Sequence, residues 1–255
     1  MSDNPFGLAG YTPSSYGDAF ADVYDEWYAT LGDHDLVDAL QRHLPPGPAD
    51  VLELGVGTGR LLDRLVAARG GITDRLTGID SSAAMIERAR TVTSLSGADL
   101  RVGDFSESLP GSEFDLVFCG WNTFFNLPDT GAMTRSLVLV RSVLRDGGRL
   151  VIDAFVPGTD TGGDRVTVRS ISTDSVVLIV SRHDEAEQRI VGQFVELTNG
   201  STVRLRPWVV RYLLPRELDA VAAEAGLRLL ERHADGGSEA FTPESRRHVS
   251  VYCPA

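Results

Sequence analysis

The sequence predicts an α/β protein whose mostly parallel sheet is covered by helices on both faces and carries an antiparallel β insertion. Between residues 51 and 154, short continuous apolar runs alternate with segments of helical period, which is typical of parallel strands buried on both faces. From Val166 to Tyr212, apolar residues instead occupy every second position, which indicates half-buried antiparallel strands. A chain of 255 residues can bury one sizeable core, so one domain with an insertion is the simplest organisation.

The first predicted element is a helix with an aromatic face. After a stretch rich in Pro, Ser and Gly over residues 1–15, apolar side chains recur three or four positions apart from Tyr16 to Leu31. This spacing places them on one face of a helix. A weaker helical period over 35–44 stops at a Pro-Pro pair, which predicts a second helix.

The alternating region and the segments after it define the remaining elements in order. The first five predicted strands are 51–54, 75–79, 99–102, 114–119 and 149–154. The helices between them are 60–69, 81–90, which begins at a serine N-cap, and 133–144, which ends at Gly147 and Gly148. The insertion has strands at 166–168, 176–180, 190–194, 203–205 and 208–212, with a turn at 198–201. The chain then continues with a helix at 215–226 and strands at 227–233 and 247–252.

The composition argues against several functional classes. No apolar run approaches the roughly 20 residues of a membrane span, and the N-terminus lacks the basic head and apolar core of a secretory signal, so no membrane partner is expected. The formal net charge of −12 argues against nucleic acid, because phosphate binding needs clustered Lys and Arg. An acidic surface suits a cationic or amine substrate, although acidity that merely keeps the protein soluble is an equal interpretation.

The cysteines and histidines show no metal-ligand spacing, so no metal site is expected. Cys119 and Cys253 both lie in apolar, strand-like runs. This placement favours buried free thiols in a reducing cytoplasm over a disulfide.

A glycine-rich turn follows the first strand, in the stretch LELGVGTG. In a parallel sheet, ligands bind beyond the carboxyl ends of the strands, where the strand order reverses. Gly55, Gly57 and Gly59 let the backbone turn tightly and approach such a ligand. The third glycine comes one residue too early for the dinucleotide fingerprint G-x-G-x-x-G, and Glu53 stands where dinucleotide-binding strands usually carry an apolar residue. Both departures disfavour a nicotinamide-dependent oxidoreductase.

Two aspartates end the next two strands. Asp80 ends the second strand, where a carboxylate can accept charge-assisted hydrogen bonds from both hydroxyls of a ribose. Asp104 ends the third strand in the stretch VGDF, where it is placed to accept from an exocyclic adenine amine. The stretch GWNTFFN follows the fourth strand, and LRDGGRLVI joins a helix to the fifth strand.

This ordered series resembles the class I S-adenosylmethionine-dependent methyltransferases over roughly residues 50–155. The family's motif I corresponds to LELGVGTG, its ribose acid to Asp80 and its adenine-region acid to Asp104. The resemblance implies a seven-stranded Rossmann-like sheet whose last strand, HVSVYC, runs antiparallel, and it implies S-adenosyl-L-methionine as the cofactor. The cofactor-binding residues that it implies are Tyr24, Glu53, Gly55, Gly57, Thr58, Gly59, Asp80, Ser81, Met85, Gly103, Asp104, Phe105, Gly120 and Trp121.

A second, looser resemblance covers most of the chain. The stretch ADVYDEWY over 21–28 is similar to the N-terminal helix of amine-directed small-molecule methyltransferases, which include amino-sugar N,N-dimethyltransferases of antibiotic pathways. The β insertion and the helix RELDAVAAEAGL match their layout. This resemblance implies a helical cap over the cofactor site in residues 1–48, a cofactor-binding core in 49–156 and 213–255, and a substrate-side lid in 157–212.

Methyl transfer from a sulfonium is an in-line displacement, so the enzyme chiefly aligns the reactants and excludes water. An amine attacks only when it is neutral, which requires desolvation or deprotonation. The catalytic candidates are Asp153 as a carboxylate for the substrate amine, Asn122 as a carbonyl that orients it, and Tyr28 as a ring that reaches over the sulfonium. Trp121 is placed to stack on a cation. Packing or capping is the alternative interpretation for each, as it is for Glu53, Met85 and Phe105.

The expected function is methyl transfer from S-adenosyl-L-methionine to a small-molecule or short-peptide acceptor, with an amine favoured and natural-product biosynthesis as the setting. The nearest alternative is a small-molecule O-methyltransferase, in which His248 or Asp153 serves as the base. A nicotinamide-dependent oxidoreductase and a non-catalytic cofactor-binding protein are the alternatives from other classes. A homodimer is left open.

Overall fold

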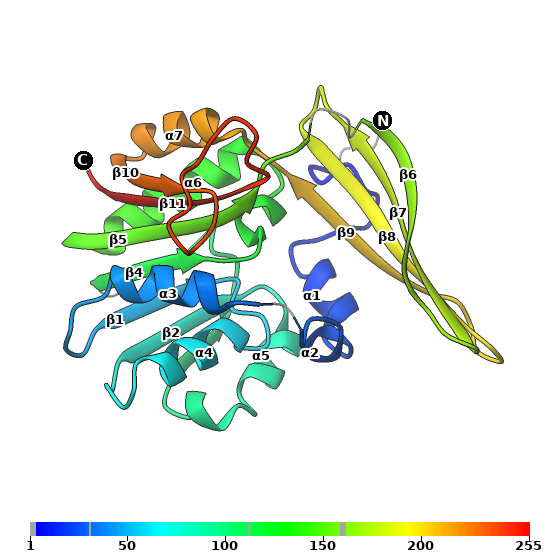
Figure 1. Ribbon diagram of the computed structural model, residues 1–255, viewed down its shortest axis with the longest axis horizontal. Coiled ribbons are helices and arrows are strands. Elements are labelled where there is room, and N and C mark those ends of the chain that lie inside the picture. Colours follow the sequence, from blue (N-terminus) through cyan, green and yellow to red (C-terminus); the bar gives the residue numbers. More distant parts are fainter. Residues whose placement is uncertain (1–3, 31, 112, 159–161) are drawn as a thin grey trace.

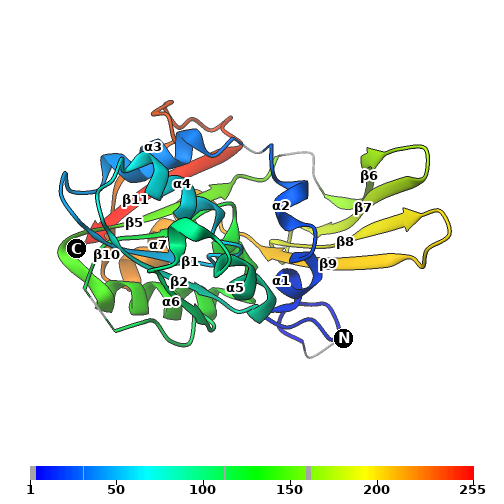
Figure 2. The same cartoon turned by 90° about the horizontal axis from the view of Figure 1, so that it is seen from below.

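The computed structural model describes residues 4–30, 32–111, 113–158 and 162–255. A seven-stranded sheet with its helices forms one body, and a four-stranded sheet projects from one side of it (Figure 1). The first helices of the chain lie between the two sheets, as a view from below shows (Figure 2).

The large sheet has the strand order β10-β11-β5-β4-β1-β2-β3. Its strands are β1 (Asp50–Leu54), β2 (Arg75–Asp80), β3 (Asp99–Val102), β4 (Phe114–Cys119), β5 (Leu144–Phe155), β10 (Leu227–His233) and β11 (Arg247–Pro254). The first five strands pair in parallel, whereas β11 runs antiparallel to both β5 and β10. The structure confirms the predicted seven-stranded, mostly parallel sheet with an antiparallel last strand.

Helices cover both faces of this sheet because its strands alternate apolar side chains between two cores. One core packs α6 (Thr130–Val143) and α7 (Pro215–Glu224) against one face. The other packs α3 (His34–Arg42), α4 (Arg60–Ala68) and α5 (Ala83–Ala89) against the opposite face. The 3-10 turns η1 (Thr93–Leu95) and η2 (Thr123–Asn126) complete the connections. None of the described helices combines the length and the apolar character that a bilayer span requires.

The small sheet contains β6 (Gly163–Ile171), β7 (Ser175–Asp184), β8 (Arg189–Thr198) and β9 (Arg204–Arg211) in sequential antiparallel order. The sequence predicts two strands where the structure has the single strand β9. Pro207, opposite Gln193, does not interrupt it, because β9 is an edge strand and its outer side needs no amide donor.

Two further predictions about local structure are wrong. The predicted helix from Tyr16 onward is divided into α1 (Ser15–Phe20) and α2 (Tyr24–Trp27), and Leu31 lies outside the described residues. Asp22, in the break, turns toward the small sheet and pairs with Arg206. Gly147 and Gly148 do not cap α6, which ends earlier at Val143, but lie in an irregular start of β5. A Cβ at Gly148 would crowd the Phe114 carbonyl.

Candidate active site

Two adjoining cavities lie beyond the carboxyl ends of β1, β2 and β4. The strand order reverses between β1 and β4, so this is the ligand-binding edge expected for such a sheet. We call them the glycine cleft, which contains Gly55 and Gly57, and the aromatic cavity, which lies against the small sheet and has a volume of about 430 Å³. The residues that line both are Tyr16, Tyr24, Thr123 and Asn126.

The turn after β1 brings backbone to the surface of the glycine cleft. Gly57 has φ +55° and faces open space, while a Cβ at Gly55, with φ +69°, would collide with Thr123. Glycine is required at both positions, because side chains disfavour a left-handed backbone and one of them would also clash. Gly59 precedes α4 and lines neither cavity. The absence of a Cβ at Gly59 instead makes room for the Leu95 side chain.

Two carboxylates stand in the glycine cleft. Asp80 accepts the Gly57 N–H at 2.9 Å through Oδ2 and the Ser82 N–H at 2.9 Å through Oδ1, and burial raises its pKa. Asp104 accepts the Ser106 N–H at 2.8 Å. These bonds fix both carboxylates at the cleft.

The other walls of the glycine cleft are apolar or come from the N-terminal segment. Met85 and Phe105, both buried, line it. Ser81 lines it too, and its hydroxyl donates to the Pro13 carbonyl at 2.8 Å. Tyr16 closes the cleft from the side of α1.

A small recess connects the turn after β1 with the end of β4, and we call it the Glu53 recess. Glu53 is 3% exposed, and its Oε2 has no hydrogen-bond partner among the residues that the structure describes. Burial raises its pKa well above the usual range, and the Arg60 guanidinium opposes that shift. Tyr24, Gly120 and Trp121 line the same recess, and burial raises the pKa of Tyr24 to about 12.

The aromatic cavity has no charged wall. Half of its fourteen lining residues are aromatic: Tyr16, Tyr24, Tyr28, Trp121, Phe155, Phe194 and Trp208. None of the described residues that line it is an Asp, Glu, Lys, Arg or His. Asn122 lines it, but its Oδ1 accepts the Phe155 N–H at 2.6 Å. The side-chain carbonyl predicted to orient an amine is therefore already hydrogen-bonded to the backbone.

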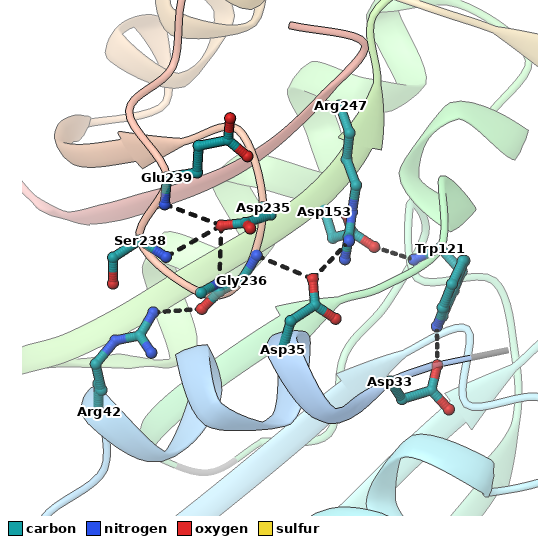
Figure 3. Close-up of polar contacts among 11 residues, drawn as sticks. Asp33, Asp35, Arg42, Trp121, Asp153, Asp235, Gly236, Ser238, Glu239 and Arg247 are labelled. Carbon is teal, nitrogen blue, oxygen red and sulfur yellow. Dashed lines mark hydrogen bonds and ion pairs between the residues drawn. The ribbon is translucent and has the colours of Figure 1, made fainter.

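Asp153, predicted as the carboxylate for a substrate amine, does not face either cavity. It is 2% exposed and lines neither space. Its Oδ1 accepts the Arg247 Nε–H at 2.6 Å, and its Oδ2 accepts the Trp121 N–H at 2.9 Å (Figure 3). Burial raises its pKa, which Arg247 opposes. Both oxygens are thus occupied within the protein.

His248 is likewise no base for the aromatic cavity. It is fully buried in β11, and its Nδ1 lies 2.8 Å from the Ser250 hydroxyl. Burial lowers its pKa to about 3, so the ring stays neutral, and it lines neither cavity.

The comparisons with known proteins decide between the nucleotides that such a cleft could hold. A family profile described as a methyltransferase domain matches residues 51–148. The solved CcbJ methyltransferase from Streptomyces caelestis is 32% identical and superposes with a TM-score of 0.85, covering 96% of this chain and 100% of its own. The chain belongs to the class I S-adenosylmethionine-dependent methyltransferases.

Two further relatives of this methyltransferase are an N-terminal methyltransferase and an O-methyltransferase by name. Cypemycin N-terminal methyltransferase from a Streptomyces species is 26% identical over 94% of this chain and 97% of its own length. Malonyl-[acyl-carrier protein] O-methyltransferase from Methylococcus capsulatus is 30% identical over 75% of this chain and 68% of its own length.

The cofactor of this methyltransferase is S-adenosyl-L-methionine, and the residues of the glycine cleft fit it. Two fixed carboxylates offer acceptors for ribose hydroxyls and an adenine amine, and Met85 and Phe105 offer apolar surface for a base. The unpaired oxygen of Glu53 suits the methionine ammonium.

Thr58, Gly59 and Gly103, also predicted to bind the cofactor, line neither cavity. The Thr58 hydroxyl instead donates to Asp25 at 2.6 Å, and Gly103 packs beside Ile79. The proposed cofactor site therefore omits these three residues.

Several lining residues were not predicted from the sequence. Thr123 and Asn126 come from η2, where the sequence gives no functional signal. Phe194 and Trp208 lie on the small sheet. Their positions at every second residue show which face they share but not what that face covers.

Proposed function

We propose that this methyltransferase methylates the neutral amine of a small-molecule or short-peptide acceptor held in the aromatic cavity, in natural-product biosynthesis. One observation carries the proposal: the cavity beside the cofactor cleft is aromatic and has no charged lining among the described residues. An ammonium ion would lose hydration there without a counter-charge, so the neutral amine, which is also the nucleophile, is favoured. A carboxylate acceptor would find no cation to pair with among the described lining residues.

For the cofactor, we propose that Asp80 holds the ribose hydroxyls and Asp104 the adenine amine. Met85 and Phe105 enclose the adenine, the Gly55 and Gly57 backbone follows the ribose and methionine, and Glu53 accepts from the methionine ammonium. Ser81, Gly120, Tyr24 and Trp121 complete this proposed site. The bound cofactor supplies an electrophilic methyl group on a sulfonium.

For the acceptor, Tyr24 and Tyr28 present rings whose centroids lie 4.8 Å apart. We propose that these rings exclude water from the reacting amine and hold it in line with the methyl group. The Asn122 side chain is fixed by Phe155, so we propose that it shapes the cavity and that its NH₂ group donates to an oxygen of the acceptor.

The proposed division of labour is a cap in residues 1–48, a cofactor-binding core in 49–156 and 213–255, and a lid in 157–212. The ion pairs between the cap and the lid support this division. Arg206 of β9 is 2% exposed and pairs with Asp22 of the cap at 2.6 Å, and Arg204 pairs with the same carboxylate at 2.8 Å. Tyr16 of the cap and Trp208 of the lid both line the aromatic cavity, where they would contact the same acceptor.

An O-methyltransferase is the alternative, and the malonyl-carrier relative supports it. A hydroxyl acceptor requires a base to remove its proton, and no Asp, Glu or His lies among the described residues that line the aromatic cavity. The cypemycin relative, whose match covers more of both chains, supports the amine.

The proposal needs only a small-molecule or short-peptide partner, and it is compatible with a monomer and with a homodimer. The net charge of −12 supports the exclusion of nucleic acid. We also propose a cytoplasmic location, because Cys119 and Cys253 are buried free thiols.

A matched acceptor panel tests the proposed function. N-methylbenzylamine, benzyl alcohol and benzoic acid share one aromatic body and differ in the nucleophile. We expect S-adenosylhomocysteine release and a dimethylated product with the amine alone. Product from the alcohol or the acid, but not from the amine, would support the O-methyltransferase instead.

A further inference from the structure

We propose that Asp153, Arg247 and Asp33 are positioning residues of the methyl transfer, which hold Trp121 as a wall shared by the Glu53 recess and the aromatic cavity. The inference rests on the proposed function for the identity of the two ligands. It assigns a role to three charged side chains that line neither the glycine cleft nor the aromatic cavity.

Trp121 occupies the boundary between the two ligand spaces. It lines the Glu53 recess together with Gly55 and Gly57, and it lines the aromatic cavity together with Tyr28. A displacement of its ring therefore changes both the end of the cofactor cleft and the start of the acceptor cavity. Because methyl transfer depends on alignment of donor and acceptor, a small displacement of this wall is costly to the rate.

The backbone at this wall is strained and is held by hydrogen bonds. Trp121 has φ +53° and Asn122 has φ +66°, a left-handed conformation that residues with side chains seldom adopt. Asp153 holds both residues, because its carboxylate accepts the Trp121 N–H at 2.9 Å and its carbonyl accepts the Asn122 N–H at 3.1 Å. Such conformations persist only where the surroundings over-determine them.

The ring of Trp121 is held from the side of α3 and from both neighbouring arginines. Its Nε1–H donates to Asp33 Oδ1 at 2.6 Å. The guanidinium carbons of Arg60 and Arg247 lie 5.5 and 5.6 Å from the ring centroid, within cation–π range. Asp33 in turn pairs with Arg60. Arg247 bridges Asp153 and, at 2.7 Å, Asp35 (Figure 3).

The contacts favour positioning over plain stabilisation. Asp33 and Asp153 are 0% and 2% exposed, and buried ion pairs contribute little net stability because their desolvation offsets the attraction. What such pairs fix is geometry. Here the charged groups come from the residue that precedes α3 and from α4, β5 and β11, and they meet at Trp121. The charged groups act on the ligands through Trp121.

The tryptophan indole N–H signals provide a readout that needs neither cofactor nor acceptor. The chain has three tryptophans, so a ¹H–¹⁵N spectrum gives three indole resonances, and Trp121→Phe identifies the one of interest. In Arg247→Gln, we expect the Trp121 resonance to move by more than its linewidth and its proton to exchange with water at least tenfold faster. Arg247→Lys, which retains the cation, should recover part of both changes.

Arg232→Gln is the matched control. Arg232, like Arg247, is a partly buried arginine at the β10–β11 side of the sheet: it pairs with Asp219, bonds to Ser250 and lies 5.6 Å from the Phe241 ring centroid. The Arg232→Gln variant should lower the free energy of unfolding about as much as Arg247→Gln does, without moving the Trp121 resonance. If Arg247→Gln fails to fold, Asp33→Asn tests the same wall by weakening only the indole acceptor and its ion pairs.

A rate measurement completes the test. With N-methylbenzylamine, Arg247→Gln should lower kcat/KM at least tenfold, while Arg232→Gln stays within twofold. A Trp121 resonance that is unmoved in Arg247→Gln, or moved equally by Arg232→Gln, would overturn the positioning role. A wild-type enzyme that ignores N-methylbenzylamine would count against the proposed function, and the indole spectra would still decide the inference.

Discussion

The glycine cleft and the aromatic cavity share four residues and differ in almost everything else. The cleft is built from one end of the parallel sheet, with two carboxylates anchored by backbone N–H groups. The cavity is built from the N-terminal helices, the turn after β4 and the small sheet, and the described residues that line it are uncharged. The difference indicates that the cleft recognises a fixed polar ligand by hydrogen bonds, while the cavity recognises its ligand by shape and aromatic surface.

The largest expected effect lies in the cleft. Asp80→Ala should weaken S-adenosylhomocysteine binding by about 1.5–3 kcal/mol, because it removes charge-assisted hydrogen bonds to the ribose. Isothermal titration measures the change, and Asp164→Ala, an exposed carboxylate of β6, is the control that should leave binding unaltered. Wild-type affinity in a folded Asp80→Ala protein would remove the ribose assignment.

The next effect lies in the cavity and should spare the cleft. Trp208→Ala should raise the KM for N-methylbenzylamine roughly tenfold, the scale of a lost aromatic or cation–π contact of about 1–2 kcal/mol. The affinity for S-adenosylhomocysteine should not change, since Trp208 does not line the glycine cleft. Trp208→Phe keeps a ring and serves as the matched variant. Equally weakened binding of N-methylbenzylamine and S-adenosylhomocysteine would mean that the glycine cleft and the aromatic cavity are not separate.

A smaller effect tests the connection between the cap and the small sheet. Arg206 and Arg204 both pair with Asp22, but Arg206 is buried and Arg204 is exposed. We expect Arg206→Gln to lower the free energy of unfolding by about 1 kcal/mol, discounted because Asp22 is half-exposed, and Arg204→Gln to lower it by less than about 0.5 kcal/mol. Urea unfolding monitored by tryptophan fluorescence compares the two variants. Equal losses of unfolding free energy would contradict a stabilising role for the buried Arg206–Asp22 pair.

The same ion pair predicts a pH dependence. Arg206 holds the pKa of Asp22 below its usual value of 3.8, so the folded-state pKa is the lower one. This contribution is fully present above the ordinary aspartate pKa and is lost as the pH falls through the lowered value. Between pH 5 and pH 3, the stability difference between wild type and Arg206→Gln should therefore shrink. If the stability difference between wild type and Arg206→Gln instead grew on acidification, the lowered pKa of Asp22 would be contradicted.

The sequence predicted the cleft better than the cavity for a physical reason. Gly57, Asp80 and Asp104 sit at strand ends whose order the topology of a parallel sheet already dictates, so local motifs suffice to bring them together. Trp208 and Tyr16 are far apart in the chain, and only the packing of α1 against β8 and β9 makes them neighbours.

Asp153 shows that a correctly predicted position at a strand end does not determine where the side chain points. Its position at the end of β5 was predicted correctly, but its partner Arg247 comes from an antiparallel strand whose register no motif encodes. A carboxylate that the sequence places at the active edge thus turns inward, where its oxygens accept from Arg247 and from the Trp121 backbone N–H.

A crystal structure of the wild-type enzyme with S-adenosylhomocysteine and N-methylbenzylamine tests the central claim most directly. The account predicts adenosine in the glycine cleft with its ribose on Asp80, and the amine nitrogen in the aromatic cavity, in line with the sulfur and beside Tyr28. An amine bound outside that cavity, or a sulfur directed away from it, would contradict the account.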